Sequence, residues 1–164
     1  MSIKKYNDDA INKQRMVPDI APGFVVFIFG IRINKIWMLH KWIPVVRSFK
    51  RMLSELQEHP EWGLLHFDYW SGNPRVSVQY WRSYDDLLGY ARDKGARHFP
   101  AWFNFNNEIS GSGAVGLWHE TFVVQEGSFE AVYKNVPALG MGKAGGLKLR
   151  DGPKISLRSG KTEL

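Results

Sequence analysis

The chain has no cysteine among its 164 residues. This absence excludes disulfide bonds, thiolate metal sites and a cysteine nucleophile. Long apolar runs are also missing: the longest, Phe24–Ile31, ends at Arg32 and is far shorter than the ~20 residues that span a bilayer. Residues 1–15 are polar and contain no signal-peptide core. We therefore expect a cytoplasmic protein with no membrane partner.

Motifs that mark several enzyme classes are missing too. The sequence contains no P-loop, no dinucleotide-binding fingerprint, and neither the HExxH nor the GxSxG pattern. Residues 143–164 hold six Lys and Arg against two acidic residues, whereas residues 23–142 hold twelve against eleven. The basic excess therefore belongs mostly to a tail. We interpret that tail as solubilising and expect no nucleic-acid partner.

The composition that is present fits one domain with a substantial core. The chain is 44% hydrophobic, and its seven Trp residues can either fill a core or line a ligand cavity. Pro18 and Pro22 disfavour a continuous helix near the N-terminus. We predict an N-terminal arm over residues 1–22, a folded domain over 23–142 and a basic tail over 143–164.

Hydrophobic periodicity predicts alternating strands and helices in this domain. Apolar residues every three or four positions from Trp42 to Leu56 indicate an amphipathic helix, with Pro44 in its first turn. Ser83 is a typical N-cap for the next helix. The predicted elements are a strand at 24–31, a helix ending near 58, strands at 63–70 and 75–82, a helix after 83 interrupted at 94–95 and resumed over 98–109, and a final strand at 115–133.

This β-α-β-β-α-β order is that of a ferredoxin-like α+β unit. Two helices in such a unit cover one face of the sheet and leave the other face open. The open face would carry large apolar groups, and exposed apolar area of that size normally indicates a partner. We therefore predict a homodimer whose two sheets meet face to face, as a dimeric α+β barrel.

The final predicted strand, Val115–Tyr133 in two parts, places polar groups inside an apolar run. Because side chains alternate along a strand, His119 lies on one face and Trp118 and Glu120 lie on the other. We expect this strand to pair with the strand at 63–70.

That pairing would bring His119 to His66 and Asp68 on the open sheet face, with Trp118 and Glu120 toward the helices. Two His and one carboxylate can bind a metal ion. Their spacing is generic, however, so we interpret these groups as hydrogen-bonded partners in a polar pocket and expect no metal.

Several other side chains could hold or stabilise charge. Asn34 and Trp37 are neutral donors that can bind a substrate oxygen or an oxyanion. Arg82 shares a strand face with Tyr80, although it could instead pair with the acidic residues that follow it. Glu120 is a candidate base if it is buried. The predicted catalytic residues are His119, His66, Asn34, Trp37, Arg82 and Glu120, and the predicted substrate contacts are Tyr80, Trp102, Trp118 and Asp68.

His98 lies on the same predicted helical stripe as Trp102 and Phe105. A lone histidine on such a stripe is typically a hydrogen-bonded core residue. It could also be the axial ligand of a haem, with His119 as the competing choice. We expect no cofactor and keep haem as the alternative.

Five stretches of the chain together resemble a small bacterial and fungal family that is named after a fumagillin-pathway monooxygenase. The resemblance extends from about Phe24 to Gly146. The stretches that carry it are GIRINKIWMLHKWIPV, VQYWRSYDDLLGYAR, HFPAWFNFN, VGLWHETFVV and YKNVPALGMGKAG. The resemblance implies a dimeric α+β barrel. That superfamily includes cofactor-free monooxygenases and haem-dependent aldoxime dehydratases, so the fold alone does not choose a chemistry.

Three functional hypotheses remain open at this point. The first is a monooxygenase, cofactor-free, acting on a hydrophobic molecule of aromatic or polyketide-like character. The second is a haem enzyme of the aldoxime dehydratase or peroxidase type. The third is a dimer that binds a small molecule without catalysis.

Overall fold

The computed structural model describes residues 11–150, and predictions on residues 1–10 and 151–164 lie outside it. The elements in chain order are β1 (Met16–Pro18), β2 (Val25–Ile33), α1 (Leu39–Glu58), a 3₁₀ turn (Pro60–Trp62), β3 (Leu64–Trp70), β4 (Arg75–Trp81), α2 (Tyr84–Arg92), α3 (His98–Asn104), a π-helical turn (Phe105–Ile109), a 3₁₀ turn (Ser110–Ser112), β5 (Val115–Val123), α4 (Met141–Gly145) and β6 (Leu147–Leu149).

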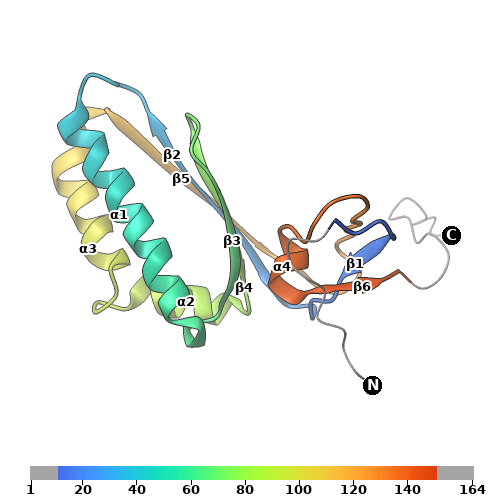
Figure 1. Ribbon diagram of the computed structural model, residues 1–164. Helices are drawn as coiled ribbons and strands as arrows, with labels where there is room; N and C mark the ends of the chain where they lie inside the picture. The colour runs from blue at the N-terminus through green and yellow to red at the C-terminus, as the bar shows by residue number, and fades with distance from the viewer. Residues whose placement is uncertain (1–10, 151–164) are drawn as a thin grey trace, which may run out of the picture.

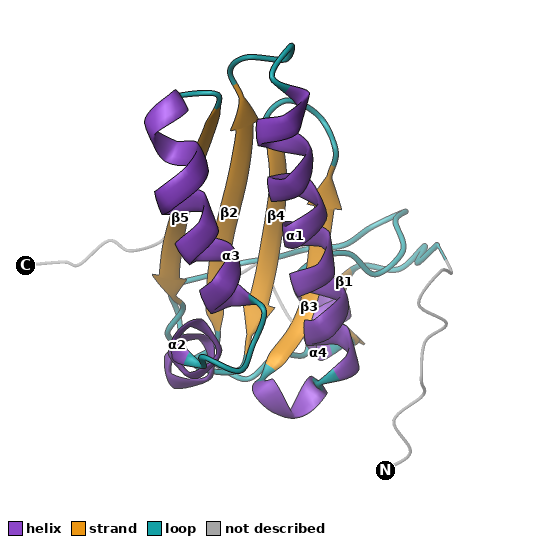
Figure 2. Ribbon diagram, turned by 90° about the vertical axis from the view of Figure 1, so that its left-hand side faces the viewer, coloured by secondary structure: helices purple, strands orange, loops and turns teal. Residues whose placement is uncertain are grey.

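A four-stranded antiparallel sheet forms the centre of the molecule, in the order β3-β4-β2-β5. Helices α1, α2 and α3 all lie on one face of this sheet (Figures 1 and 2). The predicted β-α-β-β-α-β order and the ferredoxin-like α+β class are therefore confirmed. The continuous apolar run of β2 suits its central place, because its residues from Val25 to Ile31 are buried or half-buried on both faces of the sheet.

The pairing predicted for the final strand is wrong. Strand β5 pairs with β2, with Phe29 opposite His119 and Gly30 opposite Trp118, while β3 lies at the other edge of the sheet. The predicted second half of that strand is also wrong, because β5 ends at Val123. Its C-terminal continuation instead reaches β1 through an isolated bridge between Met16 and Tyr133.

Side chains from the sheet and the helices form the core on the helix-covered face. Two clusters meet there, one around Trp81 and Leu56 and the other around Ile31 and Phe49. Trp81 and Ile31 are fully buried. The indole Nε1 of Trp81 donates a hydrogen bond to the buried Gln79 side chain at 3.0 Å, so the polar atom of this large ring is satisfied.

The helices follow the predicted pattern with one difference at their start. Helix α1 begins at Leu39, so Pro44 lies in its second turn and not in its first. Ser83 caps α2 as predicted, because its hydroxyl accepts a hydrogen bond from the Asp86 backbone N–H at 3.1 Å. The predicted interruption separates α2 from α3, and the π-helical turn extends α3 toward β5.

A small C-terminal unit covers part of the other sheet face. Strand β1 pairs with β6, matching Met16 with Leu149, and α4 precedes β6 in the chain. This unit lies on the side of the sheet away from α1, α2 and α3, beside β3 (Figures 1 and 2). The predicted division into an arm (1–22), a domain (23–142) and a tail (143–164) stays a prediction. In the structure, β1 of the predicted arm pairs with β6 of the predicted tail.

Candidate functional site

An elongated cavity lies between the helices and the sheet. It consists of two adjoining hollows of about 400 Å³ and about 380 Å³, which share much of their lining. The shared lining residues are Phe29, Phe49, Met52, His98, Trp102, Phe105 and Leu117. Most of this wall is apolar, as is typical of pockets that bind hydrophobic small molecules.

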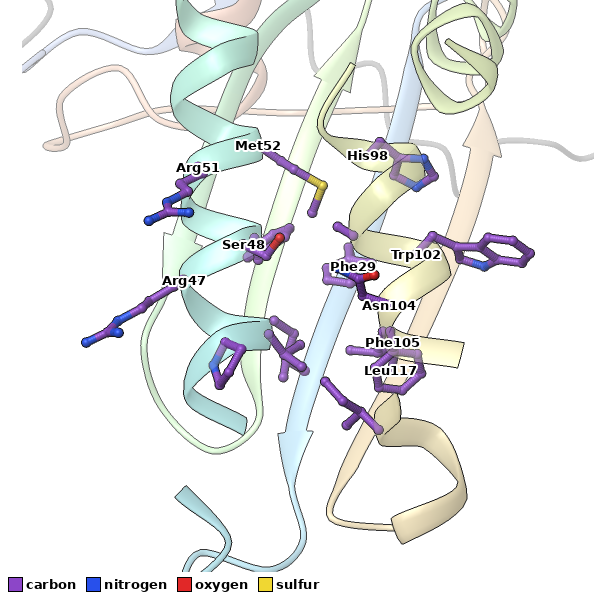
Figure 3. A pocket seen from close by; sticks show the side chains of 16 residues that line it. Phe29, Arg47, Ser48, Arg51, Met52, His98, Trp102, Asn104, Phe105 and Leu117 are labelled. Atoms are coloured by element: carbon purple, nitrogen blue, oxygen red, sulfur yellow. The ribbon is translucent and has the colours of Figure 1, made fainter. Parts of the chain in front are cut away.

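Helices α1 and α3 form the two long sides of the cavity, and β2 forms its floor (Figure 3). Met52 reaches from α1 toward the centre, whereas Arg47 and Arg51 on the same helix point away from it (Figure 3). The stripe of His98, Trp102, Phe105 and Ile109 that periodicity predicted all lines the cavity. The helical period therefore predicted correctly that these four residues share one helical segment, and the structure shows that all four border the cavity.

His98 is the polar group most firmly held in this wall. Its Nδ1 lies 3.0 Å from the backbone oxygen of Ala91. Because a carbonyl oxygen can only accept, Nδ1 carries the hydrogen and Nε2 keeps its lone pair. Burial lowers the pKa of His98 and outweighs the hydrogen bond to Ala91, which raises it, and the nearby His119 lowers it further. The ring is therefore neutral near pH 7 and able to accept a proton at Nε2.

His119 also lines this cavity, which corrects its predicted position. It lies on the helix-covered face of β5, where its ring centroid is 5.6 Å from that of Phe27. The prediction that His119 joins His66 and Asp68 is wrong for two reasons. Strands β5 and β3 are at opposite edges of the sheet, and the residues face opposite sides of it.

Trp118 and Glu120 correspondingly lie on the face that was expected to hold His119. A Cβ added to Gly30 would overlap the Trp118 ring, so that ring covers Gly30 from the side away from the helices. Trp118 still contributes to one wall of the cavity. Glu120 is exposed opposite Ile28, so the burial on which its predicted role depended is absent.

His66 and Asp68 share a face as predicted, but it is the sheet face opposite the cavity, and Tyr80 joins them there. His66 Nε2 lies 3.2 Å from Asp68 Oδ1, and the His66 ring stacks at 6.4 Å on Tyr80. The Tyr80 pKa is raised by burial first and then by the charges of Asp68 and Tyr133. Gly140 approaches Tyr80 so closely that an added Cβ would lie 2.7 Å from its hydroxyl. The chain itself therefore covers this cluster.

The remaining predicted residues lie outside the cavity. Arg82 makes a two-pronged ion pair with Asp86, with Nε–Oδ2 at 2.9 Å and Nη2–Oδ1 at 2.7 Å, which is the alternative left open by the sequence. Asn34 donates to the backbone oxygen of Gly113 at 3.2 Å. Trp37 is exposed on the loop between β2 and α1.

The sequence did not single out Phe29, Phe49 and Met52 as wall residues. All three look like ordinary core residues, and no local pattern distinguishes a residue that packs from one that borders a hollow. Within residues 11–150 there is no group of three His, Asp or Glu side chains that could hold a metal ion. The helices of the described chain are also too short or too polar to cross a membrane.

Comparisons with known proteins agree with this architecture. The profile of a family described as "Monooxygenase af470-like" matches residues 24–141. The curated Monooxygenase af470 of Aspergillus fumigatus is 26% identical over 130 residues, which cover 73% of this chain and 45% of the relative. The chain thus spans less than half the length of that relative.

Two solved structures illustrate the likeness in fold. An aldoxime dehydratase superposes with a TM-score of 0.65 and 15% identity, covering 86% of this chain and 42% of its own. The cofactor-independent oxygenase SnoaB of Streptomyces nogalater superposes with a TM-score of 0.45 and 13% identity, covering 63% of this chain and 95% of its own. The first likeness supports the fold alone, and the second is too loose to support an argument.

Proposed function

The chain belongs to the monooxygenase af470-like family, and on that basis we propose that it is a monooxygenase acting on a hydrophobic small molecule in the cavity between helices and sheet. The observation that carries this proposal is His98. A neutral imidazole, which among the described residues is hydrogen-bonded only through Nδ1, stands in the wall of a mostly apolar cavity. Such a wall binds an apolar substrate, and such a nitrogen can remove one proton from it.

The proposed reaction needs no external reductant, because the substrate supplies the electrons. His98 Nε2 removes a proton from an activated C–H of an electron-rich aromatic or polyketide-like substrate. The resulting carbanion reduces O₂ and forms a C–O bond, and the peroxide takes up the proton. Loss of water then converts the CH₂ group to a carbonyl, with O₂ supplying one oxygen to the product and one to water.

The other wall residues support the carbanion in this scheme. Phe29, Phe49 and Phe105 exclude water from the reacting carbon, which keeps the anion available to O₂. His119 can donate to a substrate oxygen on which negative charge develops, since it lies on the opposite strand wall of the same cavity. The roles given to His98 and His119 replace those predicted for His66 and Arg82.

The test uses anthrone, an electron-rich aromatic ketone with an activated CH₂ group, as the probe. Oxygen uptake and product formation are followed with the purified protein, first as isolated and then with a metal chelator. We expect turnover that the chelator does not reduce and that His98→Ala abolishes. Binding of anthrone without any oxygen uptake would instead favour the non-catalytic binding protein.

Haem is the second candidate, and the same nitrogen favours it. A histidine that binds haem iron typically donates Nδ1–H to a backbone carbonyl and offers Nε2 to the metal. His98 has the first of these features, so it would hold a haem through Nε2. Haem bound there would supply redox or Lewis-acid chemistry, while Phe29 and Phe105 would pack against the macrocycle. Haem titration separates the two ideas: a Soret shift that disappears in His98→Ala supports haem, and no shift rejects it.

We also propose that the chain forms a homodimer through the sheet face that its helices leave uncovered. Trp118 and Phe122 are exposed there on β5, which is an edge strand of the sheet. If these rings are buried between two copies, native mass spectrometry should show the mass of a dimer. The Phe122→Asp variant should show the mass of a monomer, because it places a charge in that contact.

A further inference from the structure

One end of the molecule presents apolar side chains to solvent at several adjoining places. The loop between β2 and α1 (residues 34–38) lies there beside the turn between β3 and β4. Asn73 in that turn accepts from the Ile33 backbone N–H at 3.0 Å and donates to the Ile33 oxygen at 3.1 Å. Figure 1 shows both connections at the same end of the sheet. We call this region the loop end.

The exposed side chains of the loop end are large. Trp37 is 73% exposed, Ile36 is 69% exposed and Leu39 is 51% exposed. Trp70, just before the adjoining turn, is 53% exposed. Single exposed apolar residues are ordinary on a protein surface, but a group of this size marks an interaction site.

The backbone of the loop is held in place from several sides. The Ile36 oxygen accepts from Trp42 Nε1 at 3.0 Å, and Lys35 Nζ donates to the Ser112 oxygen at 2.9 Å. The backbone N–H groups of Asn34 and Lys35 both donate to the Ala114 oxygen. These bonds hold the loop so that its apolar side chains project, and they prevent the loop from folding back to bury them.

The stretch of sequence that contains the loop end is rich in basic residues. From residue 20 to residue 54 the sequence contains six Lys and Arg and no acidic residue. Arg32 is exposed at the end of β2, and Arg47, Lys50 and Arg51 are exposed along α1. The loop and α1 as far as Arg51 therefore carry only basic charges of their own around an apolar tip. Within the described chain, the one acidic residue with a contact here is Glu108, whose backbone oxygen accepts from Lys41 Nζ at 2.9 Å.

We propose that the loop end docks on a membrane surface of anionic phospholipid. Trp, Ile and Leu at the tip match the boundary between headgroups and acyl chains, and Lys and Arg around them match the negative leaflet. Aliphatic side chains at the tip favour a bilayer over a nucleic acid, which offers phosphates and bases but no acyl layer. Peripheral docking requires no spanning segment, so the short apolar runs do not oppose it.

Docking would also bring the cavity close to the lipid. Pro44 and Val45 line the cavity and belong to the first turns of α1, directly after the loop. A hydrophobic molecule dissolved in the bilayer would then meet the mouth of the cavity without crossing bulk water. This consequence rests on the proposed function, whereas docking itself does not.

Vesicle flotation of the full chain provides the test, with phosphatidylcholine vesicles compared with mixed phosphatidylcholine–phosphatidylserine vesicles. We expect flotation with the mixed vesicles only, weakened by added salt. Trp37→Ala and Arg32→Glu should each weaken binding by about tenfold. The matched controls are Phe103→Ala, which removes an exposed ring from α3, and Lys94→Glu, which reverses an exposed charge before α3.

Four results would overturn the proposal. The first is no flotation with either vesicle, and the second is equal flotation with both. The third is a loss of vesicle binding that is no greater in the two loop-end variants than in the two controls. The fourth is binding of duplex DNA in place of vesicles. The third result would assign vesicle binding to another basic segment, such as residues 143–164. Native mass spectrometry of Trp37→Ala adds a check, because loss of a dimer would identify the loop end as a contact between copies.

Discussion

The two faces of the four-stranded sheet use the same strands but are covered in different ways. On one face, helices lie over large side chains and leave a cavity lined by Phe29, Phe105 and His98. On the other, the C-terminal unit covers the cluster of Asp68 and Tyr80 with its own backbone. The first face therefore has room for a ligand, whereas on the second face the chain itself covers the polar cluster and leaves no such room beside Tyr80.

This contrast separates histidines that look alike in the sequence. His66 has a carboxylate partner 3.2 Å away and a stacked ring, so its neighbours satisfy it. His98 lines the cavity, and among the described residues its only hydrogen bond is made by Nδ1, so Nε2 is available to accept. A histidine paired with a carboxylate, such as His66, is the usual candidate for a catalytic base. Here His98, which has no carboxylate partner within residues 11–150, is better placed because it lines the cavity.

The largest expected effect is on turnover, when a histidine on each face of the sheet is replaced by alanine in turn. His98→Ala should lower turnover of the anthrone probe about 10²–10⁴-fold, because it removes the proposed base. His66→Ala should change it little. Steady-state oxygen uptake measures both, and free imidazole should partly restore the His98→Ala variant. Equal losses in the two variants would remove the functional distinction between the faces.

Replacing a tryptophan on the helix-covered face should also cost more stability than replacing one on the opposite face. Trp81 is fully buried on the helix-covered face, so Trp81→Ala should cost about 3–5 kcal/mol of unfolding free energy. Trp118→Ala on the other face should cost less, about 1–2 kcal/mol, because 36% of this residue is exposed in the single chain. Urea unfolding gives both values, and a larger loss for Trp118→Ala would contradict the assignment of the core.

Replacing two glycines by alanine should change the unfolding free energy by smaller amounts and in opposite directions. Gly30→Ala should destabilise the fold by about 1–3 kcal/mol, because its new methyl group would displace the Trp118 ring. Gly89→Ala in α2 meets no atom within 4 Å and should stabilise by about 0.5–1 kcal/mol through its helix propensity. Opposite signs in chemical denaturation would establish that Trp118 packs on Gly30.

The pH dependence of stability should report the buried state of His98. Its pKa is lowered in the folded chain, while the unfolded side chain titrates near ~6.5. Below that pH the unfolded chain takes up a proton that the folded chain does not, so stability falls as the solution is acidified. Urea unfolding at successive pH values should show a shallower fall for His98→Gln. An unchanged slope would mean that His98 is solvated.

The smallest expected effect concerns the tyrosines on the opposite face. Burial and the charge of Asp68 raise the pKa of Tyr80 and Tyr133. Unfolded tyrosines ionise near ~10, so stability should fall as the pH rises above that value. Asp68→Asn should bring both pKa values closer to normal and make this fall shallower. Tyrosinate absorbance during alkaline titration measures the shift.

Local sequence patterns predicted most of the secondary structure. Spacings of four, three and four residues from His98 to Ile109 identified a helical stripe whose members all line the cavity. Ser83, followed by two acids, identified the start of α2. Both signals act within one or two helical turns, so the surrounding fold did not need to be known.

The sequence by itself determined the order of strands and helices from β2 to β5 and the period of each, because propensity and alternation are properties of neighbouring residues. It did not identify β1, α4 or β6, which are short and form through contacts with each other and with the sheet. Only the tertiary structure decided that β5 pairs with β2, and so that His119 faces the cavity. Alternation separates His119 from Trp118 but cannot say which of them faces the helices, since β5 is an edge strand whose residues beyond Leu117 are exposed on both faces. That choice depends on contacts between residues about 90 positions apart in the chain, such as Phe29 and His119, which no local pattern encodes.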